Sequence, residues 1–412
     1  MKKRILSIII AASMILTLTA CGQSTPSGSS ASASPTSGAA TGGQTDDKVY
    51  GDPIIIGLSL PVTGEQAAGG LQAKCGAELK ISEVNEAGGI KIGDTWHKLE
   101  MRIEDDQGNS DLVLNTVNKL ASEGAVAILG PYFSGQAIAL NDTVKELKIA
   151  LINSCTSVKI RELQNPWLWR NRCDDGINVQ IIGKAVIEDG ATKVAIMCAN
   201  DETGTAAAEG YMKYFDSKGI PYHVEWHTKS DTDLTAQISK CIAEGCDAWV
   251  SSTHDTAAVA MAKGMYELGL RNQKVYMNPI LAQAQVLEMM EPEWVEGWRC
   301  VSDFSYTDTR EEQAEFTKKF IAKYNMNPDV QGALYYSHAT VLIDAIERAQ
   351  STDREAIRDA IASTNGLKTL VGTSYASQYT DLLYEIGIAE IQNLEPVIVG
   401  SVSVAEDYGF GK

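Results

Sequence analysis

The 412-residue sequence predicts an α/β protein with two doubly wound parallel sheets, and three observations lead to this fold class. Short apolar runs alternate with helical patterns from residue 54 onward. The same alternation starts again near residue 193. The composition, with 44% hydrophobic and 21% charged residues, is typical of a globular chain with a large core. Two βαβ series in one chain indicate two parallel sheets, each flanked by helices.

The first series opens at residues 54–60, an apolar run before Pro61 that reads as a buried parallel strand. A helix with apolar residues at four-residue spacing follows, and two glycines end it. Its markers are Leu71, Cys75, Leu79, Gly88 and Gly89. Gly93 and Asp94 predict a hairpin turn, and Ser110 is the expected N-cap of the next helix. The remaining strands of this series are expected at residues 99–103, 125–130 and 149–152.

The second series predicts a helix over 205–218 and further strands along the chain. These strands are expected at residues 193–198, 222–226, 247–251 and 275–278. Ligands of such parallel sheets bind beyond the carboxyl ends of the strands. When two such domains face each other, the strand-end loops of both line one cleft.

The first 51 residues predict a leader and a tether. Lys2, Lys3 and Arg4 precede an apolar run at 5–18, which is short for a ~20-residue membrane span. The sequence Leu-Thr-Ala-Cys that ends at Cys21 resembles the bacterial lipobox, which implies a signal peptide over 1–20 and a lipid on Cys21. The alternative is an ordinary secretory signal in which this cysteine is incidental. The Ser/Gly/Thr-rich composition that follows predicts that 21–51, with the lipidated cysteine, is a flexible linker. We therefore expect an extracytoplasmic protein anchored by lipid to the cell membrane.

Charge and cysteine content narrow the possible partners. The formal charge of −18 disfavours binding to nucleic acid, because phosphate backbones are repelled. Seven further cysteines are an odd number, so no simple disulfide framework is expected. Cys75 and Cys198 read as core residues, while Cys241 and Cys246 are near enough in sequence to pair. Their spacing is not a zinc motif, and we expect no metal.

An enzyme is not expected. The sequence holds no G-x-S-x-G elbow and no P-loop, and it indicates no cofactor. His223 and His227 are four residues apart but lie on a predicted strand, where helical metal-binding geometry fails. His338, on a predicted helix, is expected to be a core or surface residue.

Three stretches resemble the type I periplasmic-binding proteins of the branched-chain amino acid transporter group. They are residues 56–64 (IGLSLPVTG), 83–90 (EVNEAGGI) and 128–135 (ILGPYFSG). The resemblance extends over roughly 52–400. It implies a monomeric solute-binding component of an ABC importer, in which two lobes close on a small molecule and deliver it to a membrane permease. A second possibility is a sensor that uses the same fold to report its ligand to a membrane kinase.

The resemblance also implies that the chain crosses between the lobes three times. The crossings are expected near Arg170, Asp303–Phe304 and Val371. The amino-terminal lobe would then hold residues 52–169 and 305–370, and the carboxyl-terminal lobe 170–304 and 371–412.

The first lobe is expected to hold the ligand's polar head. In the family, the serine of the 128–135 loop begins a helix whose free N–H groups meet the ligand carboxylate, and here this is Ser134, preceded by Tyr132 and Phe133. The next loop resembles the family's S-P-A-A-T run. Its ligand contacts fall on the backbone of Cys155 and on the hydroxyl of Ser157, and Thr156 between them is included in the predicted site. The alternatives are a plain N-cap serine and a satisfied turn hydroxyl.

The second lobe departs from the family's pattern. Thr203 stands where the family usually has an aromatic residue, and His254 and Asp255 occupy a loop that supplies a tyrosine in the leucine/isoleucine/valine-binding protein. After the next strand come Asn278 and Ile280, the latter in place of the glutamate that holds the ligand ammonium. These five residues complete the predicted site.

These departures, with Gly69 and Gly70 in place of a first-lobe tyrosine, predict a roomier pocket. A buried ammonium without a carboxylate partner costs several kcal/mol. Either Asp255, Glu202 or another acid takes over, or the ligand is not an α-amino acid. We therefore expect that leucine, isoleucine and valine are not the main ligands.

Overall fold

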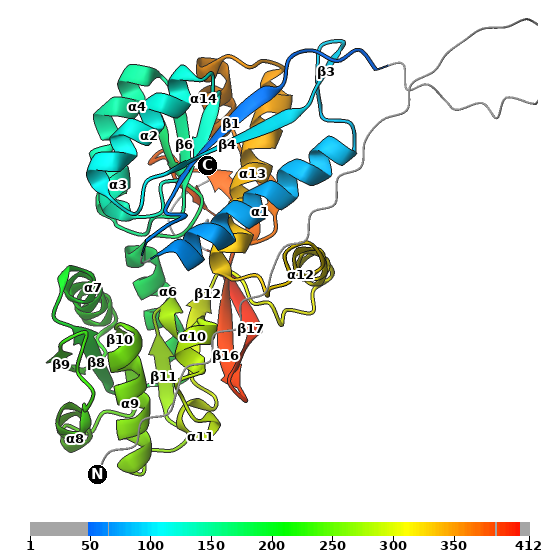
Figure 1. The fold of residues 1–412 in the computed structure, drawn as a ribbon. Helices are drawn as coiled ribbons and strands as arrows, with labels where there is room; N and C mark the ends of the chain where they lie inside the picture. The colour runs from blue at the N-terminus through cyan, green and yellow to red at the C-terminus, as the bar shows by residue number, and fades with distance from the viewer. Residues whose placement is uncertain (1–47, 65, 384, 404–412) are drawn as a thin grey trace, which may run out of the picture. The chain divides into compact units, whose positions relative to one another are not determined.

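Two parallel sheets dominate the computed structural model, which describes residues 48–403 apart from Glu65 and Tyr384 (Figure 1). The described part of the chain contains no helix long and apolar enough to cross a membrane. The predicted signal peptide, Cys21 and the linker up to residue 47 lie outside the described residues. The α/β fold class with two helix-flanked sheets is confirmed.

The first sheet has five parallel strands in the order β4-β1-β5-β6-β7. Its strands are β1 (Ile54–Leu60), β4 (Leu99–Asp105), β5 (Ala127–Leu129), β6 (Ala150–Asn153) and β7 (Leu168–Arg170). The helices of this part are α1 (Ala67–Glu86), α2 (Ser110–Ser122), α3 (Ser134–Ala139), α4 (Asn141–Leu147), α5 (Lys159–Glu162), α12 (Glu311–Tyr324), α13 (Val330–Ala349) and α14 (Arg354–Ala362).

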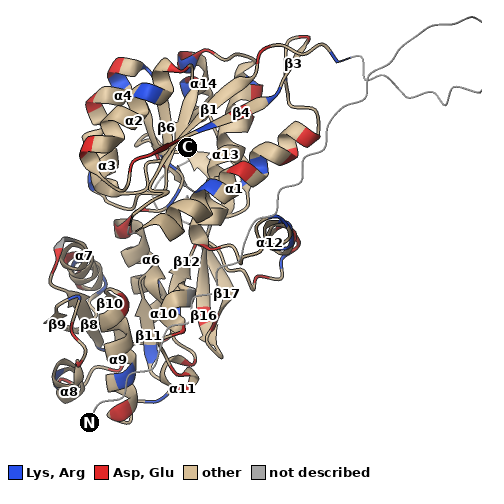
Figure 2. Cartoon of the chain, viewed as in Figure 1, with Lys and Arg blue, Asp and Glu red and all other residues tan. Residues whose placement is uncertain are grey.

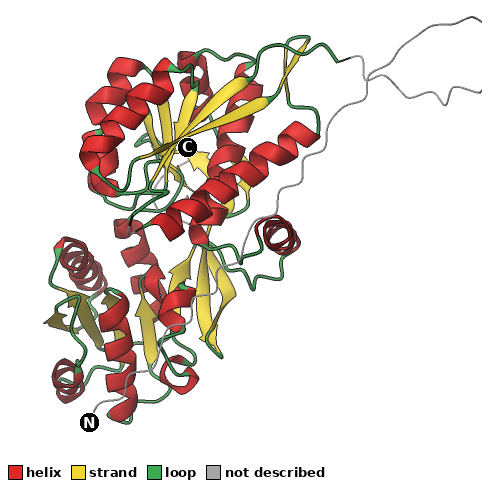
Figure 3. Cartoon of the chain, viewed as in Figure 1, coloured by secondary structure: helices red, strands yellow, loops and turns green. Residues whose placement is uncertain are grey.

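The second sheet has seven strands in the order β17-β16-β12-β11-β10-β8-β9. Its strands are β8 (Val194–Ala199), β9 (Tyr222–His227), β10 (Ala248–Ser252), β11 (Lys274–Met277), β12 (Arg299–Ser302), β16 (Glu385–Gln392) and β17 (Glu395–Ser403). The helices are α6 (Asp175–Glu188), α7 (Glu202–Lys218), α8 (Thr235–Ala243), α9 (Asp255–Glu267), α10 (Ala284–Leu287) and α11 (Pro292–Val295), with the 3-10 helix η1 (Pro279–Ala282). Figure 3 shows helices flanking the strands of both sheets.

The two sheets share one arrangement of their parallel strands. In each, the first strand of the series lies between the second and the third, so that β1 separates β4 from β5 and β8 separates β9 from β10. The direction of winding therefore reverses beside β1 and beside β8. At such a switch point the loops at the carboxyl ends of neighbouring strands diverge and leave room for a ligand.

Several details differ from the sequence-based expectation. The second sheet is not wholly parallel, because the hairpin β16–β17 adds two antiparallel strands beside β12. A separate three-stranded sheet forms from β13 (Asn365–Thr369), β14 (Gly372–Ala376) and β15 (Leu382–Leu383). The N-cap of α2 is Asn109, whose side chain accepts hydrogen bonds from two backbone N–H groups, and Ser110 is the first helical residue. The hairpin of β2 (Ile90–Ile92) and β3 (Thr95–His97) is confirmed.

The lobe boundaries remain a prediction. Among the described residues, the strands within 365–383 pair with one another and, through Asp381, with Arg170, whereas β16 joins the second sheet. Strand pairing therefore does not place residues 372–384 in the second lobe; it places the chain in the second sheet from residue 385.

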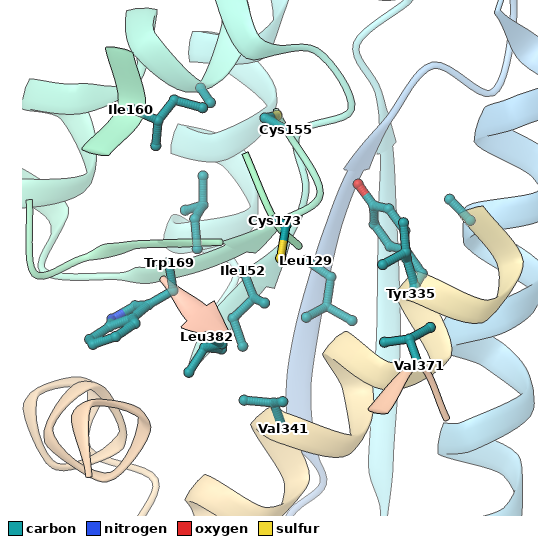
Figure 4. Packing of buried hydrophobic residues seen from close by; sticks show 14 of the residues in the cluster. Leu129, Ile152, Cys155, Ile160, Trp169, Cys173, Tyr335, Val341, Val371 and Leu382 are labelled. Atoms are coloured by element: carbon teal, nitrogen blue, oxygen red, sulfur yellow. The ribbon is translucent and has the colours of Figure 1, made fainter. Parts of the chain in front are cut away.

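Buried aliphatic and aromatic residues fill the space between strands and helices. Figure 4 shows Leu129 and Ile152 of the first sheet in the same cluster as Val341 of α13. Helices α1 and α13 approach closely, since a Cβ at Gly76 would lie 1.9 Å from the carbonyl oxygen of Gly332. Charged residues of both signs occur along helices such as α1, α4 and α12 (Figure 2).

The seven described cysteines are all free thiols. Cys75 and Cys198 are core residues, as expected. Cys241 and Cys246 do not pair, and six of the seven thiols are buried.

A buried ionic cluster forms where β7 ends. The Arg170 side chain is fully buried; its Nε donates to Asp381 Oδ1 at 2.8 Å and its Nη2 lies 3.1 Å from Asp174 Oδ2. Arg161 contacts both carboxylates from α5. The cluster ties the end of the first sheet, the N-cap of α6 and the segment before β16 to one another.

Candidate ligand-binding site

The switch point of the first sheet is occupied by Tyr132. This residue follows β5, and its hydroxyl lies against the first turn of α1, where a Cβ on Gly69 would be 2.4 Å from it. The ring packs edge-on against Phe133 with centroids 5.0 Å apart. Burial raises the pKa of Tyr132 to about 12, so the hydroxyl stays protonated at neutral pH. The Tyr132 hydroxyl therefore takes part of the space beside Gly69, and the roomier pocket stays a prediction.

Ser134 and the 153–157 loop meet beside this tyrosine. The Ser157 N–H donates to Ser134 Oγ at 3.3 Å, and the Cys155 thiol donates to the carbonyl oxygen of Pro131 at 3.5 Å. Three residues that the sequence predicts to share the site are thus brought together. Ser134 is the first residue of α3, which has only six residues, so its dipole is small.

Cys155 is less available than the resemblance implies. Its N–H donates to Asn153 Oδ1 at 3.0 Å, and its carbonyl oxygen accepts from Arg170 Nη1 at 3.5 Å. Burial raises the pKa of its thiol to about 12. A ligand contact through the backbone of Cys155 would have to share these groups. The hydroxyl of Ser157, which is half-buried, accepts a long hydrogen bond from the Lys159 N–H at 3.3 Å.

Thr156 connects this loop to α6. Its carbonyl oxygen accepts a hydrogen bond from the Asp175 N–H at 2.9 Å, and its hydroxyl bonds to the Asp175 carboxyl group. Burial raises the pKa of Asp175 to about 6, although the Thr156 hydroxyl and the charge of Arg172 oppose the rise. A loop of the first sheet and the first residue of a helix of the second are therefore directly bonded.

The switch point of the second sheet carries His254 and an acid that sequence reasoning did not select. Asp201 follows β8, caps α7 by accepting from the Gly204 N–H at 3.0 Å, and contacts His254 Nε2 through Oδ2 at 2.6 Å. Burial opposes the ionisation of Asp201, but the bonds from Gly204 and His254 keep its pKa below its ordinary value. His254 is the N-cap residue of α9, and Asp255 begins that helix. The available signal was that Asp201 lies directly after β8 and two residues before the predicted site residue Thr203.

The remaining predicted residues of the second sheet differ in exposure. Thr203 is exposed on the first turn of α7. The Asn278 amide joins the loops after β10 and β11, since its Oδ1 accepts from the Thr253 N–H at 3.3 Å and its Nδ2 donates to the Thr253 carbonyl oxygen at 3.1 Å. Ile280 packs on the core of the second sheet and is half-buried. Its side chain carries no charge at the position where the resemblance places a glutamate of the leucine/isoleucine/valine-binding protein.

A cation and an acid that sequence reasoning missed lie near the first-sheet loops. Arg172 pairs with Asp303 at 2.8 Å, which links the expected first and second crossings. Its charge acts on the pKa values of Tyr132, Cys155 and Asp329. The rule that ligands bind at strand ends could not identify Arg172 or Asp329, because Arg172 lies on a predicted crossing segment and Asp329 precedes α13.

Asp329 is an acid beside Tyr132. It caps α13 by accepting from the Gln331 N–H at 2.8 Å and the Gly332 N–H at 3.0 Å. Although its side chain reaches solvent, the surrounding protein raises its pKa to about 6.

No group of three metal-ligating side chains occurs among the residues that the structure describes. A surface groove beside α12 is lined by other residues. They are Tyr306, Asp308, Thr309, Ala314, Thr317, Lys318, Ile321 and Ala322. None of them belongs to the predicted site.

Comparison with known proteins places this geometry in context. A family model described as periplasmic binding protein matches residues 53–381. The Leu/Ile/Val-binding protein homolog 3 of Brucella melitensis is 24% identical over 81% of this chain and 89% of its own length.

Two solved structures with different ligands share the fold. The branched-chain amino acid transporter substrate binding protein of Streptococcus pneumoniae in complex with isoleucine is 21% identical, with a TM-score of 0.71 over 85% of this chain and 99% of that one. A solute binding protein of an ABC transporter from Rhodopseudomonas palustris in complex with 3,4-dihydroxy benzoic acid is 19% identical, with a TM-score of 0.71 over 87% of this chain and 99% of that one.

Proposed function

Because the chain belongs to the periplasmic binding protein family, we propose that it is the solute-binding component of an ABC importer, tethered outside the cell membrane by a lipid on Cys21. In this proposal two halves, one on each parallel sheet, close on a small polar or carboxylated solute, an amino acid or a related compound. The closed pair then delivers the solute to a permease. A ligand that contacts both halves only when they are closed stabilises that state by its differential affinity.

One observation carries the proposal. At each of the two switch points, a polar side chain connects the segments that follow two neighbouring strands. In the first sheet, Tyr132 after β5 contacts Gly69 in the helix after β1. In the second sheet, His254 after β10 contacts Asp201 after β8. The resemblance predicts ligand contacts at Tyr132 and His254. Polar side chains held at both switch points are what a two-sided grip on a polar solute requires.

Leucine, isoleucine and valine are not the main ligands in this proposal. Relatives are named for these amino acids, yet a protein of the same fold is complexed with an aromatic acid. Ile280 supplies no counter-ion for an ammonium group, and Thr203 is exposed. Calorimetry that gives a low-micromolar Kd for leucine, about −8 kcal/mol, would contradict this part of the proposal.

The binding role is tested by a thermal-shift screen of residues 22–412 against amino acids, aromatic acids, purines and short amides. A solute that binds only the folded protein at 100 times its Kd stabilises it by about 2.7 kcal/mol, which raises the melting temperature by several degrees. The shift should shrink in His254→Ala and persist in Ser239→Ala, a surface variant on α8. The absence of any stabilising solute would count against solute binding.

The lipid anchor is tested separately in cells. Cys21→Ala removes the proposed modification site, so the protein should move from the membrane fraction to the soluble extracytoplasmic fraction. An unchanged membrane fraction would show that a lipid on this cysteine is not the anchor.

A further inference from the structure

Polar atoms without partners gather at the carboxyl end of the second sheet. Within the described part of the chain, Ser251 Oγ, Thr253 Oγ1 and His227 Nε2 are buried and have no hydrogen-bond partner. The three side chains are 0%, 4% and 3% exposed. Buried polar atoms left unpaired cost roughly 1–3 kcal/mol each, so such a group calls for an explanation.

Two of these atoms lie among the predicted ligand-binding residues. Thr253 directly precedes His254, and its backbone is bonded on both sides to the Asn278 amide. His227 ends β9, and the charges of both His254 and Asp201 act on its ring. Thr253 and His227 therefore both lie near the Asp201–His254 pair.

The chemistry of the histidine can be assigned. Its Nδ1 lies 3.0 Å from the carbonyl oxygen of Thr228, which can only accept, so Nδ1 carries the hydrogen. Burial lowers the pKa of His227, which keeps the ring neutral at neutral pH. The lone pair of Nε2 is therefore an unused acceptor, and the Thr253 hydroxyl can both donate and accept.

A charged group would be less well matched here. The Asp201 carboxylate already accepts from Gly204 and contacts His254, and Ile280 is apolar. A ligand ammonium would therefore lack a dedicated counter-ion among these side chains. A hydroxyl or primary amide would give Nε2 a donor without bringing a charge.

We propose that Thr253, His227 and the Asp201–His254 pair form a hydrogen-bonding subsite that selects solutes bearing an uncharged donor, a hydroxyl or a primary amide, over apolar solutes of the same shape. The inference rests on the proposed function and specifies its ligand. An apolar group in this place would leave buried polar atoms unpaired, and sites of that kind reject the analogue that lacks the donor far more strongly than apolar pockets reject an extra methylene.

The experiment compares isosteric solute pairs by calorimetry on residues 22–412. The pairs are asparagine and leucine, threonine and valine, tyrosine and phenylalanine, and 4-hydroxybenzoate and benzoate. In at least one pair the member with the donor should bind about tenfold or more tightly than its partner. Equal or weaker binding of that member in every pair, or no binding of any pair, overturns the inference.

Two variants locate the effect. Thr253→Val keeps the shape of the side chain and removes the hydroxyl, and His227→Phe removes the acceptor; each should reduce the preference to less than about threefold. Thr317→Val is the matched control, because Thr317 Oγ1 is also buried without a partner but lies in α12. A preference that survives both site variants overturns the assignment of these residues.

The outcomes separate the two proposals. If another solute from the broad screen stabilises the protein while every isosteric pair fails, solute binding stands and the subsite is wrong. If no solute of either set stabilises it, both fail. Melting temperatures of the free variants verify that each one folds.

Discussion

At the scale of single residues, most predicted site residues already form hydrogen bonds within the protein. Ser134, Cys155 and Asn278 all bond to neighbouring loops. Such bonds fix the loops before a ligand arrives, which lowers the ordering cost of binding. The hydroxyl of Ser157 is weakly held in the protein, since the hydrogen bond that it accepts from the Lys159 N–H is 3.3 Å long.

Replacing Ser157 by alanine should weaken solute binding by about 1–3 kcal/mol, because a buried ligand group would lose its partner. The Kd from calorimetry with the solute identified in the screen measures this. Ser239→Ala, on an exposed face of α8, should leave the Kd unchanged. An unaltered affinity in Ser157→Ala would remove Ser157 from the site.

Asp175 should make stability depend on pH. Its pKa is about 6 in the folded protein against 3.8 ordinarily, so between these values the folded state binds more protons than the unfolded state. Stability attributable to this carboxyl group is therefore greatest below pH 4 and declines as the pH rises through 6. Asp175→Asn should stabilise the protein at pH 7.5 by on the order of 1 kcal/mol, with no gain at pH 4.

Urea unfolding at the two pH values checks this. The control is Asp142→Asn on the exposed surface of α4, which should show no such difference. A variant less stable than the wild type at pH 7.5 would mean that the ionised carboxyl group is favourable there, contrary to the direction of its pKa.

The sequence could predict which loops meet but not how their side chains share space. The expectation that loops at the carboxyl ends of neighbouring strands meet correctly predicted that Ser134 and Ser157 lie together. It could not show that Tyr132 fills the room beside Gly69, since this depends on the distance between α1 and the loop after β5. Nor could it select Arg172, whose contacts come from segments far apart in the chain.

At the scale of elements, close backbone contact fixes how α1 and α13 pack. The approach leaves no room for a side chain at Gly76, because a Cβ there would meet the backbone of Gly332, whereas a Cβ on Gly332 would meet the Gln72 side chain at 3.0 Å. The alternation of strands and helices could be predicted from the sequence, because the spacing of hydrophobic residues and the glycines that end helices indicate the same boundaries. The hairpin β16–β17 was not readable as part of the second sheet, since its pairing with β12 joins residues far apart in sequence.

Gly76→Ala should destabilise the protein by more than about 2 kcal/mol, although alanine favours helices by about 1 kcal/mol over glycine. The added Cβ would meet backbone, which can move only with the whole helix. Gly135→Ala in α3 is the matched control, because a Cβ there has no neighbour within 4 Å, and it should be neutral or stabilising. Midpoints of urea unfolding compare the two, and equal effects would contradict the packing argument.

At the scale of the whole molecule, the Arg170 cluster joins segments that belong to different sheets. Arg170 ends β7 of the first sheet, Asp174 caps α6, which packs on the second, and Asp381 precedes β16. Removing one member of a buried ionic group leaves uncompensated charge in the interior.

Arg170→Ala should therefore destabilise the whole chain by about 3–5 kcal/mol in urea unfolding. The control is Arg102→Ala, whose pair with Glu100 is partly exposed and should cost less than about 1 kcal/mol. A loss of equal size in the two variants would show that the buried cluster has no special role.

The seven buried or half-buried thiols also make this protein a suitable reporter for its own ligand. Of the seven described cysteines, Cys246 alone is partly accessible to solvent, and none forms a disulfide bond. With Cys246 changed to serine, a single cysteine introduced at exposed Thr203 would be the one readily labelled position in the described chain. A fluorophore attached there would sit at the edge of the proposed site, and its emission would follow solute concentration without any added reagent.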